Sequence, residues 1–207
     1  MIIICDLSYK SESLSFFEYV KPIEEIIKKT EMSFKTVHYS ELEKKSESSN
    51  NSEEYSGLQN FLLKKATGII LCGTALKDNE FLKKTEIFQF LKYTEIPVLG
   101  ICAGFQVIAK LFGGNIIENK KIGMTTVKTI SDSPVLRGMD KFEAYELHKN
   151  SFELPADFLI LAESDTDIQV IKHRYKLIFG VIFHPEVRNE RVVENFLGII
   201  RGTCKSV

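Results

Sequence analysis

Three short apolar runs and one weaker strand candidate constrain the fold of this chain more than any other feature of its sequence. The apolar runs occupy residues 2–7, 68–72 and 97–101, and the weaker candidate occupies 34–39. Runs of this length are typical of strands covered on both faces of a sheet. Strands that alternate with helices favour parallel pairing through right-handed crossovers. We therefore expect an α/β fold of the flavodoxin-like type, a doubly wound, mostly parallel sheet with helices on both faces.

The segments around these runs carry other patterns. Residues 22–27 start with Pro22 and then repeat isoleucines at helical spacing, and residues 80–93 place apolar side chains on one face. Residues 116–183 hold short strand-like runs with few helical stretches, which predicts a small antiparallel β-ribbon insertion. A last strand and a terminal helix from about residue 190 to 200 should follow. Residues 44–54, KKSESSNNSEE, lack apolar side chains and predict a flexible loop.

Composition limits the number of domains and the kinds of partner. A chain of 207 residues with 44% hydrophobic content can bury one core, so we expect a single domain over residues 1–207. Its 27 basic and 28 acidic residues give a net charge of −1, which supplies no general attraction for nucleic acid or an acidic membrane surface. The opening MIIICDL is too short for a signal peptide, and no window approaches the ~18 apolar residues of a spanning helix. We expect a cytoplasmic protein with no nucleic-acid and no membrane partner.

A cysteine between two glycines lies at the end of the apolar run at 97–101. The stretch GICAG at 100–104 has the form of a sharp strand-to-helix turn that exposes a nucleophile, here Cys102. A helix that begins at Ala103 would point its free N–H groups at the sulfur and stabilise the thiolate. Cys102 is therefore the candidate nucleophile. The other cysteines, which show no C-x-x-C spacing, are expected to be small hydrophobic residues: Cys5, Cys72 and Cys204.

A thiol nucleophile needs a base and a group that orients the base. His184 ends the apolar run at 177–183, and Pro185 is typical of a strand terminus. Because side chains alternate along a strand, Glu186 is expected on the same side as His184. Two other histidines, His38 and His173, are expected at the surface. Cys102, His184 and Glu186 are the candidate triad; the alternative is a strand-end histidine satisfied by a backbone group.

Two motifs together resemble a known family, the class I (triad) glutamine amidotransferases. The elbow of that family reads G-x-C-x-G-x-Q and its base segment reads G-V-x-F-H-P-E; this chain has GICAGFQ at 100–106 and GVIFHPE at 180–186. The similarity extends from about Gly68 to the C terminus. Within the family, the order of PVLGICAGFQVIAKLFGGNI, LPADFLILAESD and GVIFHPEVRNERVVENF is most similar to the glutaminase subunits of GMP synthases.

The resemblance implies the fold of that family and glutamine hydrolysis without a metal or another cofactor. Cys102 would attack the side-chain amide, and His184, oriented by Glu186, would protonate the departing ammonia. Water would then cleave the γ-glutamyl thioester, and Gln106 would help to hold the substrate. The chain shows no ATP-binding loop, so the ammonia would pass to a separate synthetase of the ATP-pyrophosphatase type. In GMP synthase that partner converts XMP to GMP.

Several segments depart from the family pattern. The Gly-Gly-Pro loop that helps to bind the oxyanion corresponds to residues 72–75, so the implied hole comprises Ala103 with Thr74 and Gly73. The S-H-G-D segment near the substrate corresponds to 147–150, which implies contacts from His148, Lys149 and Asn150. The glutamine that usually precedes F-H-P-E is replaced by isoleucine, and the N-terminal G-G-Q-Y signature is missing. Two alternatives therefore stay open: a stand-alone hydrolase of another γ-glutamyl compound, and a catalytically impaired regulatory or binding module of the same fold.

Overall fold

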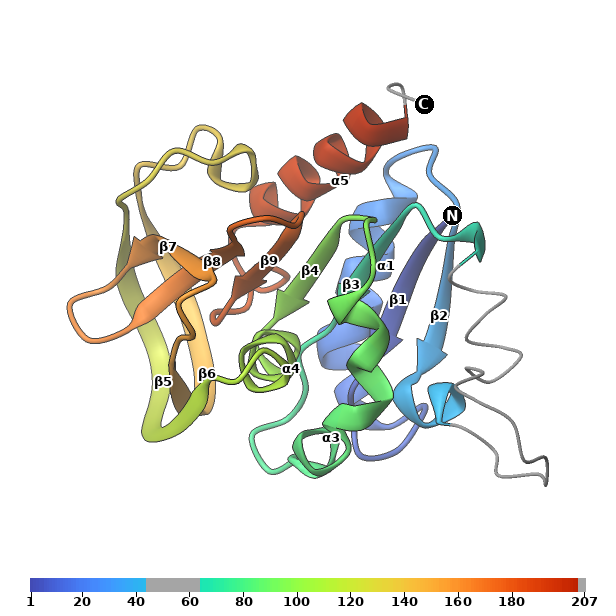
Figure 1. Ribbon diagram of the computed structural model, residues 1–207, viewed down its shortest axis with the longest axis horizontal. Coiled ribbons are helices and arrows are strands. Elements are labelled where there is room, and N and C mark those ends of the chain that lie inside the picture. Colours follow the sequence, from blue (N-terminus) through green and yellow to red (C-terminus); the bar gives the residue numbers. More distant parts are fainter. Residues whose placement is uncertain (44–63, 205–207) are drawn as a thin grey trace.

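The computed structural model describes residues 1–43 and 64–204 (Figure 1), so the predicted loop at 44–54 lies outside the described residues. The described strands form one sheet in the order β2-β1-β3-β4-β9-β8-β7-β5-β6. Their bounds are β1 (Ile2–Asp6), β2 (Phe34–His38), β3 (Gly68–Leu71), β4 (Val98–Ile101), β5 (Asn115–Thr129), β6 (Lys141–Glu153), β7 (Phe158–Glu163), β8 (Ile168–His173) and β9 (Ile178–Val181). The described part of the chain includes no helix long and apolar enough to cross a membrane.

One half of the sheet is parallel. Strands β2, β1, β3, β4 and β9 pair in parallel, with Ile2 opposite both Phe34 and Gly68. Every residue of β1, β3, β4 and β9 is buried, which explains why these strands read as unbroken apolar runs. The arrowheads of β1, β2 and β4 point to the bottom of Figure 1. The carboxyl ends of the parallel strands therefore share one edge of the sheet.

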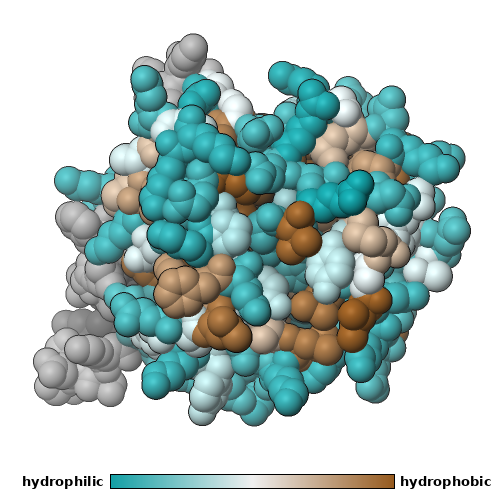
Figure 2. Space-filling model, turned by 180° about the vertical axis from the view of Figure 1, so that it is seen from behind, coloured by the Kyte–Doolittle hydropathy of each residue, from teal (hydrophilic) through white to brown (hydrophobic). Residues whose placement is uncertain are grey.

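The other half of the sheet is antiparallel. Pairings β9–β8, β8–β7, β7–β5 and β5–β6 are all antiparallel, so four of the eight pairings in the described sheet are of this kind. The antiparallel part is larger than the small insertion expected from the sequence, because β8 pairs with β9 and continues the sheet. Figure 2 shows brown, hydrophobic residues between teal ones on the back of the molecule. Large apolar side chains of β5 remain exposed: Ile116, Ile117, Ile122 and Met124.

Helices cover both faces of the parallel half, which confirms the predicted α/β class. One core contains side chains of α1 (Lys21–Lys28) and α5 (Arg191–Cys204), such as Ile23 and Phe196. The other contains side chains of η3 (Thr85–Lys92) and α4 (Ala103–Leu111), such as Phe88 and Phe105. The helix expected at 80–93 is divided at Lys84 into a short α-helix and a 3-10 helix. The helical bounds are η1 (Phe16–Val20), α1 (Lys21–Lys28), η2 (Tyr39–Leu42), α3 (Glu80–Lys83), η3 (Thr85–Lys92), α4 (Ala103–Leu111), η4 (Pro134–Leu136) and α5 (Arg191–Cys204).

Two glycines let α4 pack directly against the sheet. A Cβ on Gly100 would lie 2.5 Å from the carbonyl carbon and oxygen of Gly104. A Cβ on Gly104 would collide with the backbone carbonyl of Leu71 in β3 and lie 2.6 Å from the Leu71 Cβ. Since backbone cannot give way as a flexible side chain can, both positions require glycine. The helix therefore starts immediately after β4, with Cys102 in the connection.

Candidate active site

Cys102 lies between β4 and α4 in a backbone conformation that side chains rarely adopt. Its φ is 46° and its ψ is −93°, outside the regions that ordinary residues prefer. Such strain persists only where the surrounding structure enforces it, and it is frequent at functional sites. Cys102 is 2% exposed, and its Sγ contacts the carbonyl oxygen of Leu147 in β6 at 3.5 Å. The first residue of α4, Ala103, follows directly, so Cys102 occupies the N-cap position of the helix, at the positive end of its dipole.

The structure brings His184 and Glu186 into contact, although not by the strand alternation expected from the sequence. The Nδ1 atom of His184 lies 2.6 Å from Oε1 of Glu186, and both side chains are fully buried. Strand β9 ends at Val181, and the chain then turns. In this turn the N–H groups of Val187 and Arg188 donate to the carbonyl oxygen of His184 at 3.2 and 3.3 Å. The turn, rather than the strand pleat, places the carboxylate against the imidazole.

The opposite ring nitrogen of His184 is available for chemistry. Nε2 has no hydrogen-bond partner among the described residues. Burial alone would lower the pKa of His184, but the charges of Cys102 and Glu186 outweigh burial and raise that pKa well above 6.5. The ring of Tyr19 lies 5.1 Å from the imidazole between centroids, and the ring of Tyr145 lies 6.4 Å away. Burial, followed by nearby negative charge, raises the pKa of Tyr19 to about 12.

The thiols of Cys5 and Cys72, in contrast to that of Cys102, lie inside the parallel half of the sheet and do not line the pocket beside the elbow. Burial is the largest cause that raises the pKa of Cys5 and of Cys72, and neighbouring negative charges raise both further. Both side chains lie within the apolar cores. Cys5 and Cys72 are therefore buried hydrophobic residues, as expected from the sequence, while Cys204 lies in α5.

A pocket of about 110 Å³ opens beside Cys102. Residues from three separate segments line it, and they include most of the sequence candidates: Thr74, Ala75, Leu76, Asp78, Asn79, Phe81, Cys102, Ala103, Gln106, Leu147, His148, Lys149 and Asn150. Ligand sites for drug-sized molecules hold roughly 300–1,000 Å³, so this pocket suits a substrate of amino-acid size.

Gly73 does not line this pocket in the described structure; it packs against the candidate base instead. A Cβ at Gly73 would lie 2.7 Å from Cε1 and 3.1 Å from Nδ1 of His184, and 3.6 Å from Cβ of Cys102. The glycine therefore leaves the space that the imidazole fills. The N–H groups of Gly73, Thr74 and Ala103 donate no hydrogen bond within the described part of the chain.

The candidate substrate contacts are linked to one another. The side chain of Asn150 donates a hydrogen bond from Nδ2 to Oε1 of Gln106 at 3.1 Å. His148 is buried, and its Nε2 lies 3.3 Å from Oε1 of Glu146. Lys149 is exposed at the pocket wall. Strand β6 thus presents a neutral amide, an imidazole and a cation to the pocket.

Two histidine predictions were wrong. His38 and His173 are 8% and 6% exposed, respectively, rather than surface residues. Nε2 of His38 lies 2.8 Å from the carbonyl oxygen of Ser8, and the ring of His173 packs against Phe112 at 5.0 Å between centroids. Both positions are explained by local packing, and neither residue lines the pocket beside Cys102.

The sequence interpretation also missed two residues near the site. Tyr19 belongs to η1, and Asp78 follows β3 in an irregular loop. Neither residue belongs to the elbow or to the base segment. The only available signal for Asp78 was its spacing of four residues from Thr74, whose hydroxyl donates to Oδ2 of Asp78 at 2.7 Å.

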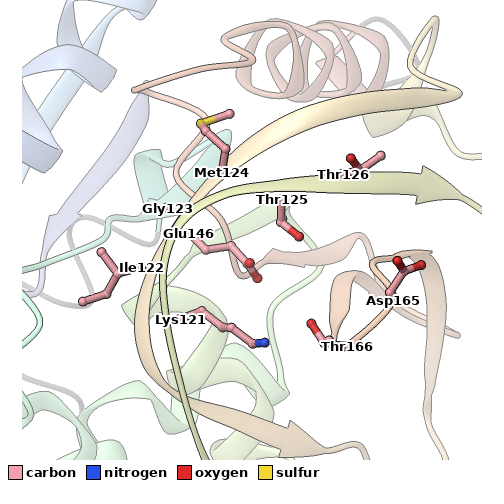
Figure 3. Close-up of a pocket in the computed structure, with 9 residues that line it drawn as sticks. All are labelled: Lys121, Ile122, Gly123, Met124, Thr125, Thr126, Glu146, Asp165 and Thr166. Carbon is pink, nitrogen blue, oxygen red and sulfur yellow. The ribbon is translucent and has the colours of Figure 1, made fainter.

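A second pocket, of about 360 Å³, lies on the antiparallel half of the sheet (Figure 3). Lys121, Asp165 and Glu146 are among its lining residues. The Glu146 carboxylate is also near His148 and Asp167, and ligand-type atoms of the three lie within 4.8 Å of one another. However, Glu146 accepts a hydrogen bond from Gln169 at 2.7 Å, and Asp167 accepts one from Asn119 at 2.6 Å. Protein donors already satisfy these carboxylates, so the contacts give no specific reason to place a metal there.

The fold and the site together define a class of protein: α/β proteins with a cysteine, histidine and carboxylate at the carboxyl edge of a parallel sheet. The family model described as Glutamine amidotransferase class-I matches residues 18–197. The chain belongs to this family.

Relatives agree with that assignment, and solved structures share the fold. The glutamine-hydrolysing GMP synthase subunit of Methanobrevibacter smithii is 34% identical over 127 residues, covering 57% of this chain and 67% of the relative. The same subunit of Methanothrix thermoacetophila is 34% identical over 145 residues, covering 66% and 78%. The crystal structure of a GMP synthase subunit protein from Thermoplasma acidophilum has a TM-score of 0.79 at 22% identity, covering 99% of this chain and 95% of that one. A glutamine amidotransferase from Thermotoga maritima has a TM-score of 0.65 at 22% identity, covering 99% and 84%.

Proposed function

We propose that this chain hydrolyses glutamine and supplies the ammonia to a separate synthetase subunit, the one that converts XMP to GMP. The observation that carries the proposal is the 2.6 Å contact between His184 Nδ1 and Glu186 Oε1, which leaves Nε2 free beside the strained elbow of Cys102. The similarity to glutamine-hydrolysing GMP synthase subunits supports the choice of synthetase. The cytoplasm, where nucleotide synthesis takes place, remains the proposed location.

In the first half of the reaction, Cys102 acts as the nucleophile and His184 as the general acid. The thiolate sulfur forms a bond to the side-chain carbonyl carbon of glutamine, and the carbonyl electrons move to the oxygen. When this tetrahedral intermediate collapses, the carbon–nitrogen bond breaks and Nε2–H of His184 donates its proton to the departing nitrogen. The raised pKa of His184 favours the protonated ring that this step requires. Ammonia leaves, and a γ-glutamyl thioester remains.

In the second half, neutral His184 acts as the general base. Its Nε2 accepts a proton from water while the water oxygen attacks the thioester carbon. The carbon–sulfur bond then breaks, and glutamate and the Cys102 thiolate are released. Glu186 holds Nδ1–H throughout, so the lone pair of the neutral ring stays on Nε2.

The oxyanion of each tetrahedral intermediate needs fixed hydrogen-bond donors. We assign this role to the N–H groups of Ala103 and Thr74, which line the pocket and donate no hydrogen bond within the described residues. Gly73, the remaining candidate, has an N–H group that is equally unpaired there, but its clearest structural role is to admit the imidazole. Removal of one such donor typically lowers the rate by about 10² to 10³.

The decisive experiment measures ammonia release from glutamine by the chain alone and by its complex with the synthetase. Cys102→Ala should abolish release in both samples, because none of the other described residues that line the pocket is a cysteine. Cys5→Ala is the matched control and should retain the activity, since Cys5 is buried in β1. Unchanged glutamine hydrolysis by the Cys102→Ala complex would exclude the proposal.

The altered segment at 147–150 favours one second candidate, a stand-alone hydrolase of another γ-glutamyl compound, since three of these residues differ from the family pattern and all four line the pocket. Faster turnover of γ-glutamyl peptides than of glutamine by the purified chain would support this candidate. A binding module without catalysis would instead show no reaction of Cys102 with a glutamine-like electrophile, even with the synthetase present.

A further inference from the structure

The pocket beside Cys102 contains one acidic side chain whose presence the triad does not explain. Among the described lining residues, Asp78 is the only carboxylate and Lys149 the only side chain with a permanent positive charge. Burying a charged group of a ligand is costly unless an opposite charge or hydrogen bonds meet it. The Asp78 carboxylate therefore indicates that the pocket receives a positively charged group of a ligand.

The carboxylate of Asp78 is held in place from one side. Its Oδ2 accepts a hydrogen bond from the Thr74 hydroxyl at 2.7 Å and another from the backbone N–H of Tyr9 at 3.1 Å. The backbone N–H of Asp78 donates to the carbonyl oxygen of Ala75 at 2.8 Å, which closes the turn. No described residue donates to Oδ1. One oxygen is thus anchored, and the other remains available to a ligand.

Thr74 contributes a contact that a glycine at this position could not make. The residue is 3% exposed, so its hydroxyl has little access to water and is committed to Asp78. Its backbone N–H remains unpaired among the described residues, so it can serve separately as a donor in the oxyanion hole. The side chain and the backbone of Thr74 can therefore be tested separately.

We propose that Asp78, positioned by Thr74, binds the α-ammonium group of the substrate. This inference rests on the proposed function, and it assigns the substrate to the class of free α-amino acids with a γ-carboxamide. The amide group lies against Cys102, and the α-ammonium group donates a charge-assisted hydrogen bond to Oδ1 of Asp78. Lys149, on the β6 wall, meets the α-carboxylate. The two charges of the pocket thus complement the two charges of the amino acid.

The test compares glutamine with glutaramate, which is glutamine without its α-amino group. For the native complex, kcat/KM should be roughly ten- to hundredfold higher with glutamine, the usual range for a hydrogen bond between charged groups. In Asp78→Asn, KM for glutamine should rise by a similar factor while kcat changes little, and the values for glutaramate should stay the same. Asp132→Asn, which changes an exposed acid, is the matched control and should keep the preference.

Thr74→Val provides the second variant, because it preserves the backbone N–H and the shape but removes the hydroxyl. It should reduce the preference for glutamine over glutaramate, and Thr74→Ser should restore it. Damage to the oxyanion hole would instead lower kcat for both substrates equally. Some variants could unfold too readily for steady-state assays. For these, we would measure the rate at which Cys102 reacts with a diazoketone analogue of glutamine. The same analogue without its α-amino group then gives the comparison in the intact chain.

The outcomes separate this inference from the proposed function. A full preference for glutamine in Asp78→Asn, or an equal loss with both substrates, would overturn the role of Asp78 and leave glutamine hydrolysis by Cys102 intact. If the native complex hydrolyses neither compound and Cys102 reacts with neither analogue, the proposed function fails as well. Loss of the preference in Asp78→Asn alone supports the assignment.

Discussion

At the scale of single residues, the candidate site depends on a glycine, which has no side chain, as much as on the candidate catalytic side chains. Gly73 leaves the space that the His184 ring occupies, and Glu186 fixes the orientation of that ring. The side chains of Glu186 and His184 are both fully buried, so neither can relax by moving into solvent. Small changes at these positions should therefore have large effects on catalysis.

Gly73→Ala should lower glutamine hydrolysis by roughly 10²-fold, a loss typical for displacement of a catalytic group by about 1 Å. The new Cβ would lie 2.7 Å from Cε1 of His184, so the ring must shift. Steady-state kinetics of the complex would measure the loss, and circular dichroism would show whether the fold is retained. Activity close to that of the native protein would contradict the proposed close fit.

Glu186→Gln should lower the pKa of His184, because the carboxylate is one of the two charges that oppose the effect of burial. An NMR titration of the imidazole would measure the change. The raised native pKa means that the folded protein holds a proton that the unfolded chain releases above pH 6.5.

The stabilisation from this proton is complete below the unfolded value and is lost as pH rises through the native pKa. Urea denaturation over a pH series should therefore show that the stability advantage of the native protein over Glu186→Gln declines above pH 6.5. An unchanged imidazole pKa in the variant would show that Glu186 does not stabilise the imidazolium.

At the scale of elements, the junction of β4 and α4 determines where the thiol lies. Gly100 and Gly104 allow the helix to approach the strand, and Cys102 between them takes a positive φ. The sequence pattern G-x-C-x-G predicted this junction well because it is local: all of its residues lie within five positions. The pairing of His184 with Glu186 was predicted for the wrong reason, since a turn replaces the expected strand.

Gly104→Ala should destabilise the protein by about 1–3 kcal/mol, the usual cost of forcing extra atoms into a packed core. Its Cβ would meet the backbone of Leu71 in β3, which cannot move without disturbing the sheet. Gly198→Ala in α5 is the matched control, because a Cβ there meets no atom within 4 Å. That variant should gain up to about 1 kcal/mol from the higher helix propensity of alanine. Thermal and urea unfolding would measure both, and equal stabilities would contradict the role of Gly104.

At the scale of the whole molecule, the candidate site is assembled from segments that are distant in sequence. The loop after β3, the elbow after β4, the middle of β6 and the turn after β9 all contribute. The first, second and fourth follow neighbouring parallel strands, whose carboxyl ends meet at one edge of the sheet. The third comes from the antiparallel half, which places Leu147 against Cys102. Formation of the site should therefore require the complete fold.

Binding of substrate should in turn stabilise the complete fold. In Cys102→Ala, which cannot turn glutamine over, L-glutamine at a hundredfold excess over its Kd should raise the free energy of unfolding by about 2.7 kcal/mol. Urea denaturation with and without glutamine would measure the increase, and L-asparagine, whose side chain is shorter, is the control. An equal shift with both amino acids would indicate binding elsewhere.

The sequence by itself determined the features that depend on neighbours along the chain. The apolar runs indicated the buried parallel strands, the glycines around Cys102 indicated the elbow, and two motifs pointed to the amidotransferase family, which the comparison confirms. These signals survive in a single sequence because strand burial, helix spacing and tight turns each impose a local residue pattern.

The tertiary structure alone decided which distant groups meet. Half of the strand pairings in the described sheet are antiparallel, His38 and His173 are buried, Gly73 packs against the candidate base, and Asp78 lines the pocket. None of these contacts has a periodic pattern, because each depends on the pairing of strands and the packing of loops far apart in the chain. The sequence therefore indicated the candidate reacting groups, and the folded sheet decided what surrounds them.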